Sequence, residues 1–87
     1  MAEVVLKETA MVRVGSARVG CGNLWEREYA LPDGSTTTGM SARVAIGDSV
    51  HYIGAGSELV VDGTRYRVAG IDKEPGKLGL VRLETVN

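Results

Sequence analysis

The chain has 87 residues, 44% of them hydrophobic, and its ten basic and eleven acidic residues leave a formal charge of −1. This length and composition suit one folded domain and exclude a disordered chain. The basic residues are scattered, without a cluster of Lys or Arg, which argues against binding of nucleic acid and against a polybasic membrane anchor.

The amino-terminal residues do not resemble a targeting segment. Between Glu3 and Lys7 there are only three consecutive apolar residues, too few for a signal peptide. No stretch approaches the ~18 apolar residues of a membrane span. The single cysteine, Cys21, excludes an internal disulfide framework and is compatible with a reducing compartment. We therefore expect a cytoplasmic protein.

Turn-forming residues recur about every ten residues along the chain, and no segment has a helical period. The pattern predicts an all-β fold: one domain over residues 1–87, a small β-sandwich or partly open barrel of antiparallel hairpins with a C-terminal three-strand meander. The first two of the expected strands could form one bent strand. The strands are expected near residues 3–7, 10–14, 17–31, 36–46, 49–53, 57–61, 64–71 and 78–86.

The register of the first long hairpin follows from its apolar residues. If residues 32–35 form a four-residue loop, Leu31 pairs with Thr36, and one face becomes apolar while the other becomes polar. The apolar face would collect Val19, Cys21, Trp25, Tyr29, Leu31, Met40, Ala42, Val44 and Ile46. The polar face would collect Gly20, Gly22, Glu26, Glu28, Gly39, Ser41 and Arg43.

The C-terminal meander can be registered from its turns. An Asp62-Gly63 turn between alternating apolar residues is a strong hairpin signal and pairs Glu58 with Arg67. A second turn at Pro75-Gly76 pairs Arg67 with Glu84. This predicts a solvent-facing charge row across three strands. The opposite side of the same strands would supply the core residues Tyr66, Val68, Val81 and Leu83.

Trp25, Arg27 and Tyr29 alternate along one strand and form the main candidate binding site. Trp, Tyr and Arg are the residue types enriched at binding hot spots. The competing interpretation, which the register favours, is a core aromatic pair with Arg27 reaching outward to water. If the protein instead binds a small molecule, Trp25, Arg27 and Tyr52 are expected to line the pocket.

Other candidate chemistry is weaker. Cys21 and His51 could form a nucleophile and its base, but a free cysteine on an apolar face is usually a core residue, and strand alternation places His51 toward solvent. One Cys and one His do not supply a zinc site, so we expect no metal or cofactor. The glycines of Gly20-Cys21-Gly22 and Gly54-Ala55-Gly56 lack the following helix of a phosphate loop, which favours bulges, a bend or close packing.

Three segments resemble small uncharacterised β-rich proteins of actinobacteria. They are residues 3–7 (EVVLK), 13–20 (RVGSARVG) and 56–68 (GSELVVDGTRYRV). The similarity spans both ends of the chain and thins out across residues 21–55. It implies a compact β fold and a bacterial or phage origin, and it assigns no functional residues.

These observations predict a non-enzymatic module that binds another protein, or a second copy of itself, through a sheet face or edge. An accessory, immunity-type or phage-associated role fits such a module. The alternative is a β-barrel or sandwich that binds a small molecule near Trp25, Arg27 and Tyr52. We expect no catalytic residues and neither a nucleic-acid nor a membrane partner.

Overall fold

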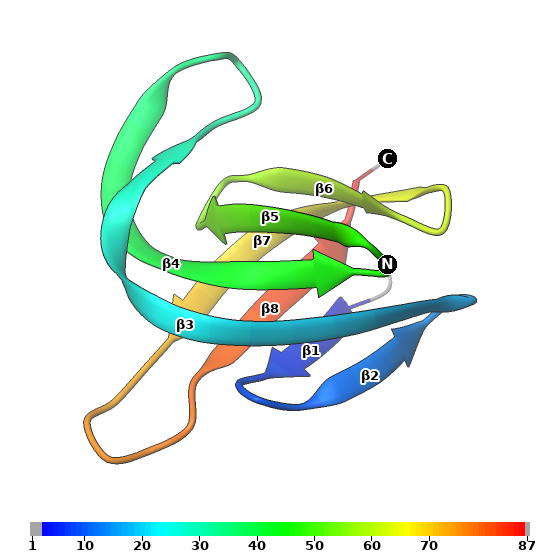
Figure 1. The fold of residues 1–87 in the computed structure, drawn as a ribbon. Helices are drawn as coiled ribbons and strands as arrows, with labels where there is room; N and C mark the ends of the chain where they lie inside the picture. Colours follow the sequence, from blue (N-terminus) through cyan, green and yellow to red (C-terminus); the bar gives the residue numbers. More distant parts are fainter. Residues whose placement is uncertain (1–2, 87) are drawn as a thin grey trace.

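A computed structural model describes residues 3–86, which form two antiparallel four-stranded sheets (Figure 1). One sheet has the strand order β1-β8-β7-β6, with β1 at Glu3–Lys7, β6 at Glu58–Val61, β7 at Thr64–Asp72 and β8 at Leu80–Thr85. The other has the order β2-β3-β4-β5, with β2 at Met11–Val14, β3 at Ala17–Ala30, β4 at Thr36–Ile46 and β5 at Ser49–Gly54. The predicted all-β class is confirmed. The sheets do not close into a barrel, an arrangement compatible with a small β-sandwich.

The hydrophobic core lies between the two sheets, because each strand alternates apolar and polar residues and turns its apolar side inward. The β1-β8-β7-β6 sheet contributes Leu6, Leu59, Val61, Tyr66, Val68, Val81 and Leu83. The β2-β3-β4-β5 sheet contributes Val14, Val19, Cys21, Leu24, Ala42, Val44 and Ile53.

The predicted C-terminal meander is confirmed. Asp62 and Gly63 both have positive φ, 50° and 78°, as a tight hairpin turn between two strands requires. Arg67 pairs with Glu58 on one side and with Glu84 on the other, so the charge row exists. Within it, Arg67 forms its ion pair with Glu84 at 3.1 Å, whereas Glu58 lies 3.8 Å from Arg65.

The suggestion that the first two strands form one bent strand is wrong. A turn separates them: Thr9 has a φ of 67°, and the Ala10 amide donates to the Lys7 carbonyl at 3.1 Å. The reversal sends β1 and β2 into different sheets. This turn is therefore one of the points where the two sheets are joined.

The predicted register of the β3–β4 hairpin is also wrong. Thr36 pairs with Ala30 instead of Leu31, and the loop is one residue longer than expected. A second shift lies between Gly22 and Trp25, where Asn23 adopts a φ of 50°. Such a bulge adds a residue to one strand and reverses the side to which the following residues point. On β3 the expected apolar face is consequently correct on the Cys21 side of the bulge and incorrect beyond it, where Trp25 and Tyr29 point to the other side. On β4 the expected apolar residues are correct throughout, since Met40, Ala42, Val44 and Ile46 belong to the core or pack against it.

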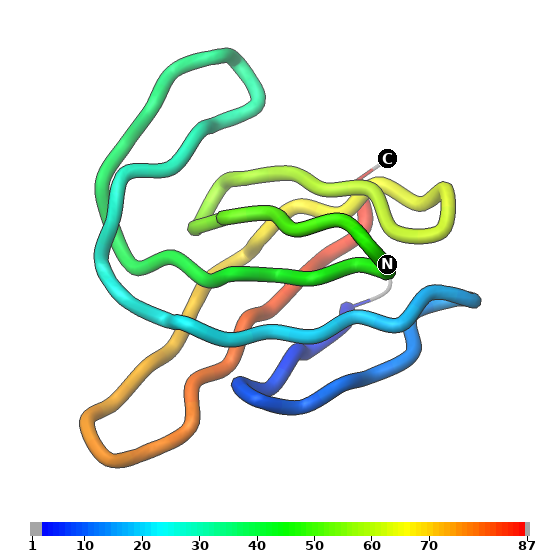
Figure 2. Tube along the Cα trace, viewed as in Figure 1, coloured from blue at the N-terminus to red at the C-terminus, as the bar shows by residue number. Residues whose placement is uncertain are grey.

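The hairpin curls, and its tip bends back over the β5–β6 connection (Figure 2). Ser57 holds the two segments together, since its hydroxyl donates to the Ala30 carbonyl at 3.0 Å and accepts from the Gly54 amide at 3.2 Å. Ser57 is only 3% exposed, so these bonds are shielded from water. The curl gives the β2-β3-β4-β5 sheet a raised rim at this end.

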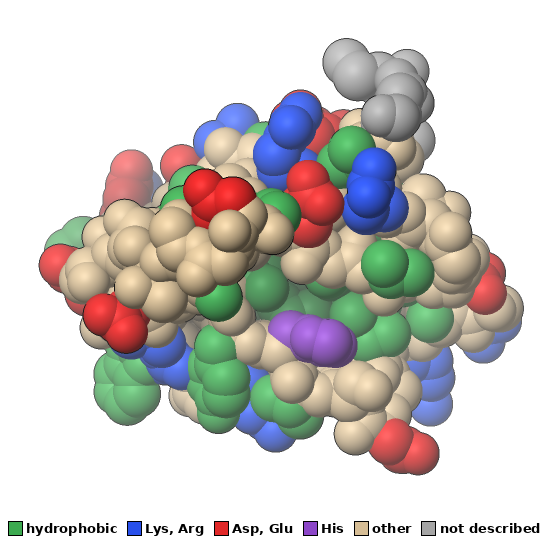
Figure 3. Space-filling view, turned by 90° about the horizontal axis from the view of Figure 1, so that it is seen from above, with side chains coloured by type: hydrophobic (Ala, Val, Ile, Leu, Met, Phe, Trp, Pro, Cys, Tyr) green, Lys and Arg blue, Asp and Glu red, His purple; other side chains and the backbone are tan. Residues whose placement is uncertain are grey.

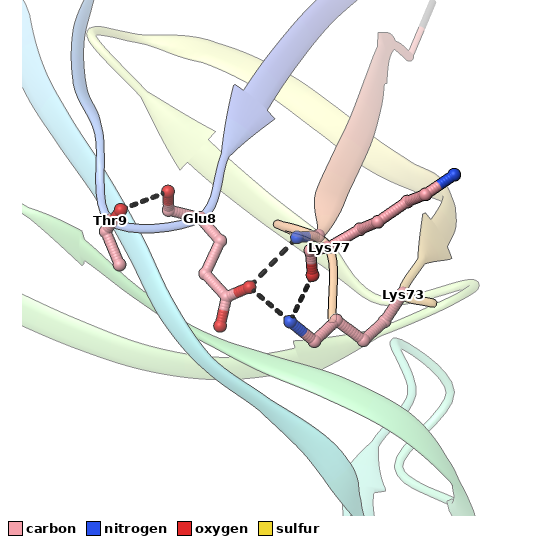
Figure 4. A network of polar contacts seen from close by, with 5 residues as sticks. Glu8, Thr9, Lys73 and Lys77 are labelled. Carbon is pink, nitrogen blue, oxygen red and sulfur yellow. Dashed lines mark hydrogen bonds and ion pairs between the residues drawn. The ribbon is translucent and has the colours of Figure 1, made fainter. Parts of the chain in front are cut away.

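A polar cluster fastens the β1–β2 turn to the β7–β8 loop (Figure 4). One carboxylate oxygen of Glu8 accepts from the Lys73 ammonium at 2.8 Å and from the Gly79 amide at 2.9 Å. The Glu8 amide in turn donates to the Gly79 carbonyl at 2.9 Å. The hydrogen bond from Lys73, followed by that from Gly79, lowers the pKa of Glu8 below its ordinary value.

We expect Glu8→Gln to lower the free energy of unfolding at neutral pH by about 0.2–1 kcal/mol, the range of a partly exposed ion pair. Because the pKa of Glu8 is lowered in the folded state, its contribution is present above the ordinary value of 4.5 and is lost as pH falls through the folded value. Urea unfolding of both proteins at neutral pH and below pH 4.5 measures this difference. Glu26→Gln, an exposed carboxylate on β3, is the control. If Glu8→Gln were still less stable than the wild type by the same amount at acid pH, the ionised Glu8 carboxylate would not be the source of the difference.

Candidate functional site

The bulge in β3 decides where Trp25 points. Leu24 enters the core at 8% exposure, and Trp25 lies on the opposite side of the sheet with 62% of its surface exposed. The favoured interpretation of Trp25 as a core aromatic is therefore wrong. The residue belongs instead to an exposed surface.

Arg27 lies between two aromatic rings. Its guanidinium carbon is 5.2 Å from the centre of the Trp25 ring and 4.7 Å from the centre of the Tyr52 ring. Both distances allow a cation–π attraction, which is stronger where water is excluded. Tyr52 comes from β5, so the stack crosses the sheet and orders two exposed aromatic side chains.

Hydrogen bonds fix this stack to the sheet. Arg27 Nη2 donates to the Asn23 carbonyl at 3.1 Å, within the bulge, and Arg27 Nε is buried without a hydrogen-bond partner. Ser41, the cross-strand partner of Trp25, is fully buried and donates to the Trp25 carbonyl at 3.0 Å. The arginine thus serves mainly to position the two aromatic rings.

Tyr29, the third residue of the predicted stripe, is not exposed. Its ring packs on Gly54, where a Cβ atom would overlap ring atoms Cε2 and Cζ, and its hydroxyl donates to the Ala55 carbonyl at 2.9 Å. Tyr29 is 8% exposed. It lies on the same side of β3 as Trp25 and Arg27, and it anchors the curled hairpin to the end of β5.

The exposed aromatic residues belong to a larger surface, the side of the β2-β3-β4-β5 sheet that points away from the core and toward the viewer in Figure 1. We call it the outer face. Cross-strand partners share a face, so the pairing identifies its members. They include Met11, Arg13, Arg18, Gly20, Gly22, Trp25, Arg27, Tyr29, Gly39, Ser41, Arg43, Ala45, Val50, Tyr52 and Gly54.

Four of the seven large hydrophobic side chains that are exposed among the described residues lie on the outer face: Met11, Trp25, Val50 and Tyr52. Sequence reasoning missed Met11 and Val50. Their sequence neighbours carry no clear signal, since Ser49 and His51 are exposed as well and Ala10 is only partly buried. The two residues acquire meaning only when β2, β3, β4 and β5 are known to share one sheet.

A shallow depression of about 210 Å³ lies on the outer face. The glycines of β3, Gly20 and Gly22, form its floor, and Met11 and Arg43 stand beside it. Its volume is below the roughly 300 Å³ at which small-molecule pockets begin. Trp25, Arg27 and Tyr52 do not line it, so this depression is not the pocket expected around those three residues.

Cys21 and His51 do not meet. Both lie in one cross-strand row, but Val44 stands between them, pairing with Cys21 on one side and His51 on the other. Neighbouring strands are about 4.8 Å apart, so the thiol and imidazole lie beyond hydrogen-bond reach. Burial, with a smaller effect of the Glu8 charge, raises the pKa of the Cys21 thiol to about 11. The thiol is therefore protonated at neutral pH.

His51 is exposed as expected, but the side that alternation predicted for it is wrong. It pairs with the buried Val44 and so lies on the core side of β5, whereas Val50 and Tyr52 point outward. It lies at the open edge of the sandwich, where β5 pairs only with β4 and β6 only with β7. Figure 3 shows hydrophobic side chains around the histidine in a hollow of this edge. Within residues 3–86, no three His, Cys, Asp or Glu residues are grouped so that they could hold a metal ion.

Comparison of the chain with protein-family models, with curated proteins and with solved structures finds no match. The described residues contain no helix that could cross a membrane. The surface itself is therefore the basis for a functional proposal.

We expect Trp25→Ala to change the free energy of unfolding by no more than about 1 kcal/mol, because the residue is exposed and loses only its cation–π contact with Arg27. A core tryptophan would instead cost roughly 3–5 kcal/mol. Trp25 is the only tryptophan, so its emission reports on this position alone. Red-shifted emission that iodide quenches is expected. Blue-shifted, shielded emission would place the indole in the core and refute the bulge.

Proposed function

We propose that the protein is a non-enzymatic protein-binding module and that the outer face of the β2-β3-β4-β5 sheet is its binding surface. The observation that carries the proposal is the gathering of Met11, Trp25, Val50 and Tyr52 on this one face. Aromatic residues, Met and Arg are enriched at protein interfaces relative to other surfaces.

The aromatic side chains of this surface also have packing partners within the chain. Arg27 fills the space between the Trp25 and Tyr52 rings, and a sheet backbone holds both residues. Ordering side chains on binding costs about 0.5–1.5 kcal/mol for each long side chain. A preformed stack avoids part of this cost, which supports recognition of a large, flat partner.

The shallow shape of the face favours a protein over a small molecule as its ligand. The depression beside Arg43 offers about 210 Å³, and the aromatic stack does not line it but adjoins it, since Arg43 pairs with Tyr52. A protein partner could cover the depression and the stack together. The resemblance to small actinobacterial proteins supports a bacterial or phage origin, and the single cysteine fits a reducing compartment such as the cytoplasm. In that setting we propose an accessory, immunity-type or phage-associated role.

A comparative pull-down from the native host tests the proposal. The wild-type protein and Val60→Ser are used as bait beside Trp25→Ala and Tyr52→Ala. Val60 is 58% exposed but lies on β6 of the other sheet, which makes it a matched control. A partner retained by the first two baits and lost from the last two supports the outer face. Equal capture by all four, or saturable binding of a metabolite alone, would overturn the proposal.

A further inference from the structure

The arginines of the two sheets differ in their partners. On the β1-β8-β7-β6 sheet every arginine has a carboxylate nearby: Arg65 with Glu58 at 3.8 Å, Arg67 with Glu84 at 3.1 Å and Arg82 with Asp72 at 3.2 Å. On the outer face of the other sheet, none of the four arginines forms an ion pair with any described residue. These four are Arg13, Arg18, Arg27 and Arg43.

Two of these arginines face each other. Arg13 on β2 and Arg18 on β3 are direct cross-strand partners, and both are exposed. Like charges placed opposite each other destabilise a sheet. The pair therefore destabilises the isolated protein. This favours a role for the two arginines in binding a partner.

The outer face also lacks negative charge in its strands. Glu26 and Glu28 alternate with Trp25 and Arg27 along β3 and so point to the other side. Asp48 lies in the turn between β4 and β5. The chain has a formal charge of −1, so the residues other than the four arginines together carry −5. Positive charge is thus concentrated on the surface that carries the exposed aromatic residues.

We propose that the partner of the outer face is an acidic protein segment whose carboxylates bind Arg13, Arg18 and Arg43. This inference rests on the proposed function and names the chemistry of the partner. Arg27 is excluded from direct carboxylate binding, because it is held between the Trp25 and Tyr52 rings. Arginine suits the role, since its planar guanidinium binds a carboxylate through two parallel hydrogen bonds.

The positions of the arginines in the sheet also set the spacing of the carboxylates expected in the partner. Arg43 pairs with Gly22, four residues beyond Arg18 along β3. Four residues of a strand span about 13 Å. A partner in extended conformation would therefore present acidic residues about four positions apart, with apolar residues between them over Met11 and Val50, which lie in the row of Gly20.

Charge favours a protein segment over nucleic acid. Domains that bind nucleic acid usually have a pI above about 9, whereas this chain has a pI near 5.7. A long polyanion would also meet the negative remainder of the molecule. A short acidic segment of a folded partner would contact the outer face alone.

The test uses an acetylated dodecapeptide with glutamates four residues apart among leucine and serine residues, its analogue with glutamine in place of glutamate, and a dodecamer of deoxythymidylate. Binding is followed by the emission of Trp25 and by amide chemical shifts of the outer face. We expect the glutamate peptide to bind at least about tenfold more tightly than the glutamine analogue, the loss expected when charge-assisted hydrogen bonds are removed.

Variants that remove arginines from one sheet or the other show which surface binds the glutamate peptide. The double variant R13Q/R18Q should weaken binding of the glutamate peptide by about tenfold or more, with the matched variant R65Q/R67Q on the other sheet unchanged. R13Q/R18Q should fold at least as stably as the wild type in thermal unfolding, because it removes the opposed like charges.

Four outcomes would overturn the inference. Equal binding of both peptides would leave the outer face as a protein-binding surface without selectivity for acid, so the proposed function would survive alone. Tighter binding of the oligonucleotide would assign the face to single-stranded nucleic acid. A dimer in light scattering that R13Q/R18Q dissociates would show that a second copy covers the face. No shift with either peptide up to about 1 mM would remove both the inference and its support for the proposed function.

Discussion

Leu83→Ala should destabilise the protein by about 2–5 kcal/mol, the range measured when a buried leucine is truncated and its cavity does not collapse. Leu83 is fully buried on β8, an interior strand, where it pairs with Val4 of β1 and Val68 of β7. The atoms around it are held by strands on both sides, so they have little freedom to fill the space.

The destabilisation expected for Leu83→Ala is large compared with the total free energy of unfolding. At about 0.05–0.15 kcal/mol per residue, a chain of this size has a stability on the order of 4–13 kcal/mol. Urea unfolding followed by circular dichroism should show a lower midpoint with an unchanged slope. Leu78→Ala, in the β7–β8 loop where the residue is 65% exposed, is the control and should stay within about 0.5 kcal/mol. Equal effects of the two variants would contradict the core placement.

Gly54→Ala should destabilise the protein by about 1–3 kcal/mol, although it adds only one methyl group. The new Cβ would overlap the ring of Tyr29, which is buried and fixed by its hydrogen bond to the Ala55 carbonyl. The overlap is removed only if the Tyr29 ring moves, and this movement releases the curled hairpin from the end of β5. The expected signs are lower thermal stability and faster amide hydrogen exchange around Tyr29 and Ala30.

Gly22→Ala is the matched control, since a Cβ there meets no atom within 4 Å. Both glycines lie within strands of the same sheet, so the loss of glycine's backbone freedom in the unfolded chain is similar in the two variants. Gly22→Ala should therefore be neutral or slightly stabilising. If Gly54→Ala proved equally harmless, Tyr29 would not anchor the hairpin.

Together, these variants separate the support of the outer face from the face itself. Leu83 and Gly54 hold the sandwich and its curled hairpin, whereas Trp25 and Tyr52 stand on the surface. Leu83→Ala and Gly54→Ala should lower stability. Truncation of the second pair should lower binding and leave stability nearly unchanged.

The sequence alone determined the fold class, the strands and the C-terminal meander. These features depend on local signals: period-two alternation, an Asp62-Gly63 turn that accepts positive φ, and opposite charges that pair across strands. It also identified Trp25 and Arg27 as unusual, and Tyr52 as a candidate neighbour. The pairing of Arg67 with Glu84 follows from these signals without knowledge of the other sheet.

Only the tertiary structure decided the rest, because the decisive contacts join segments far apart in the chain. The bulge at Asn23 places Leu24 in the core against Gly79 of the β7–β8 loop, and so turns Trp25 outward. Alternation within β3 cannot reveal this, since one inserted residue reverses every later side chain. The same assembly gathers on one face arginines that are scattered in the sequence, Arg13, Arg18 and Arg43. A charge pattern read along the chain therefore missed the surface that the sheet creates.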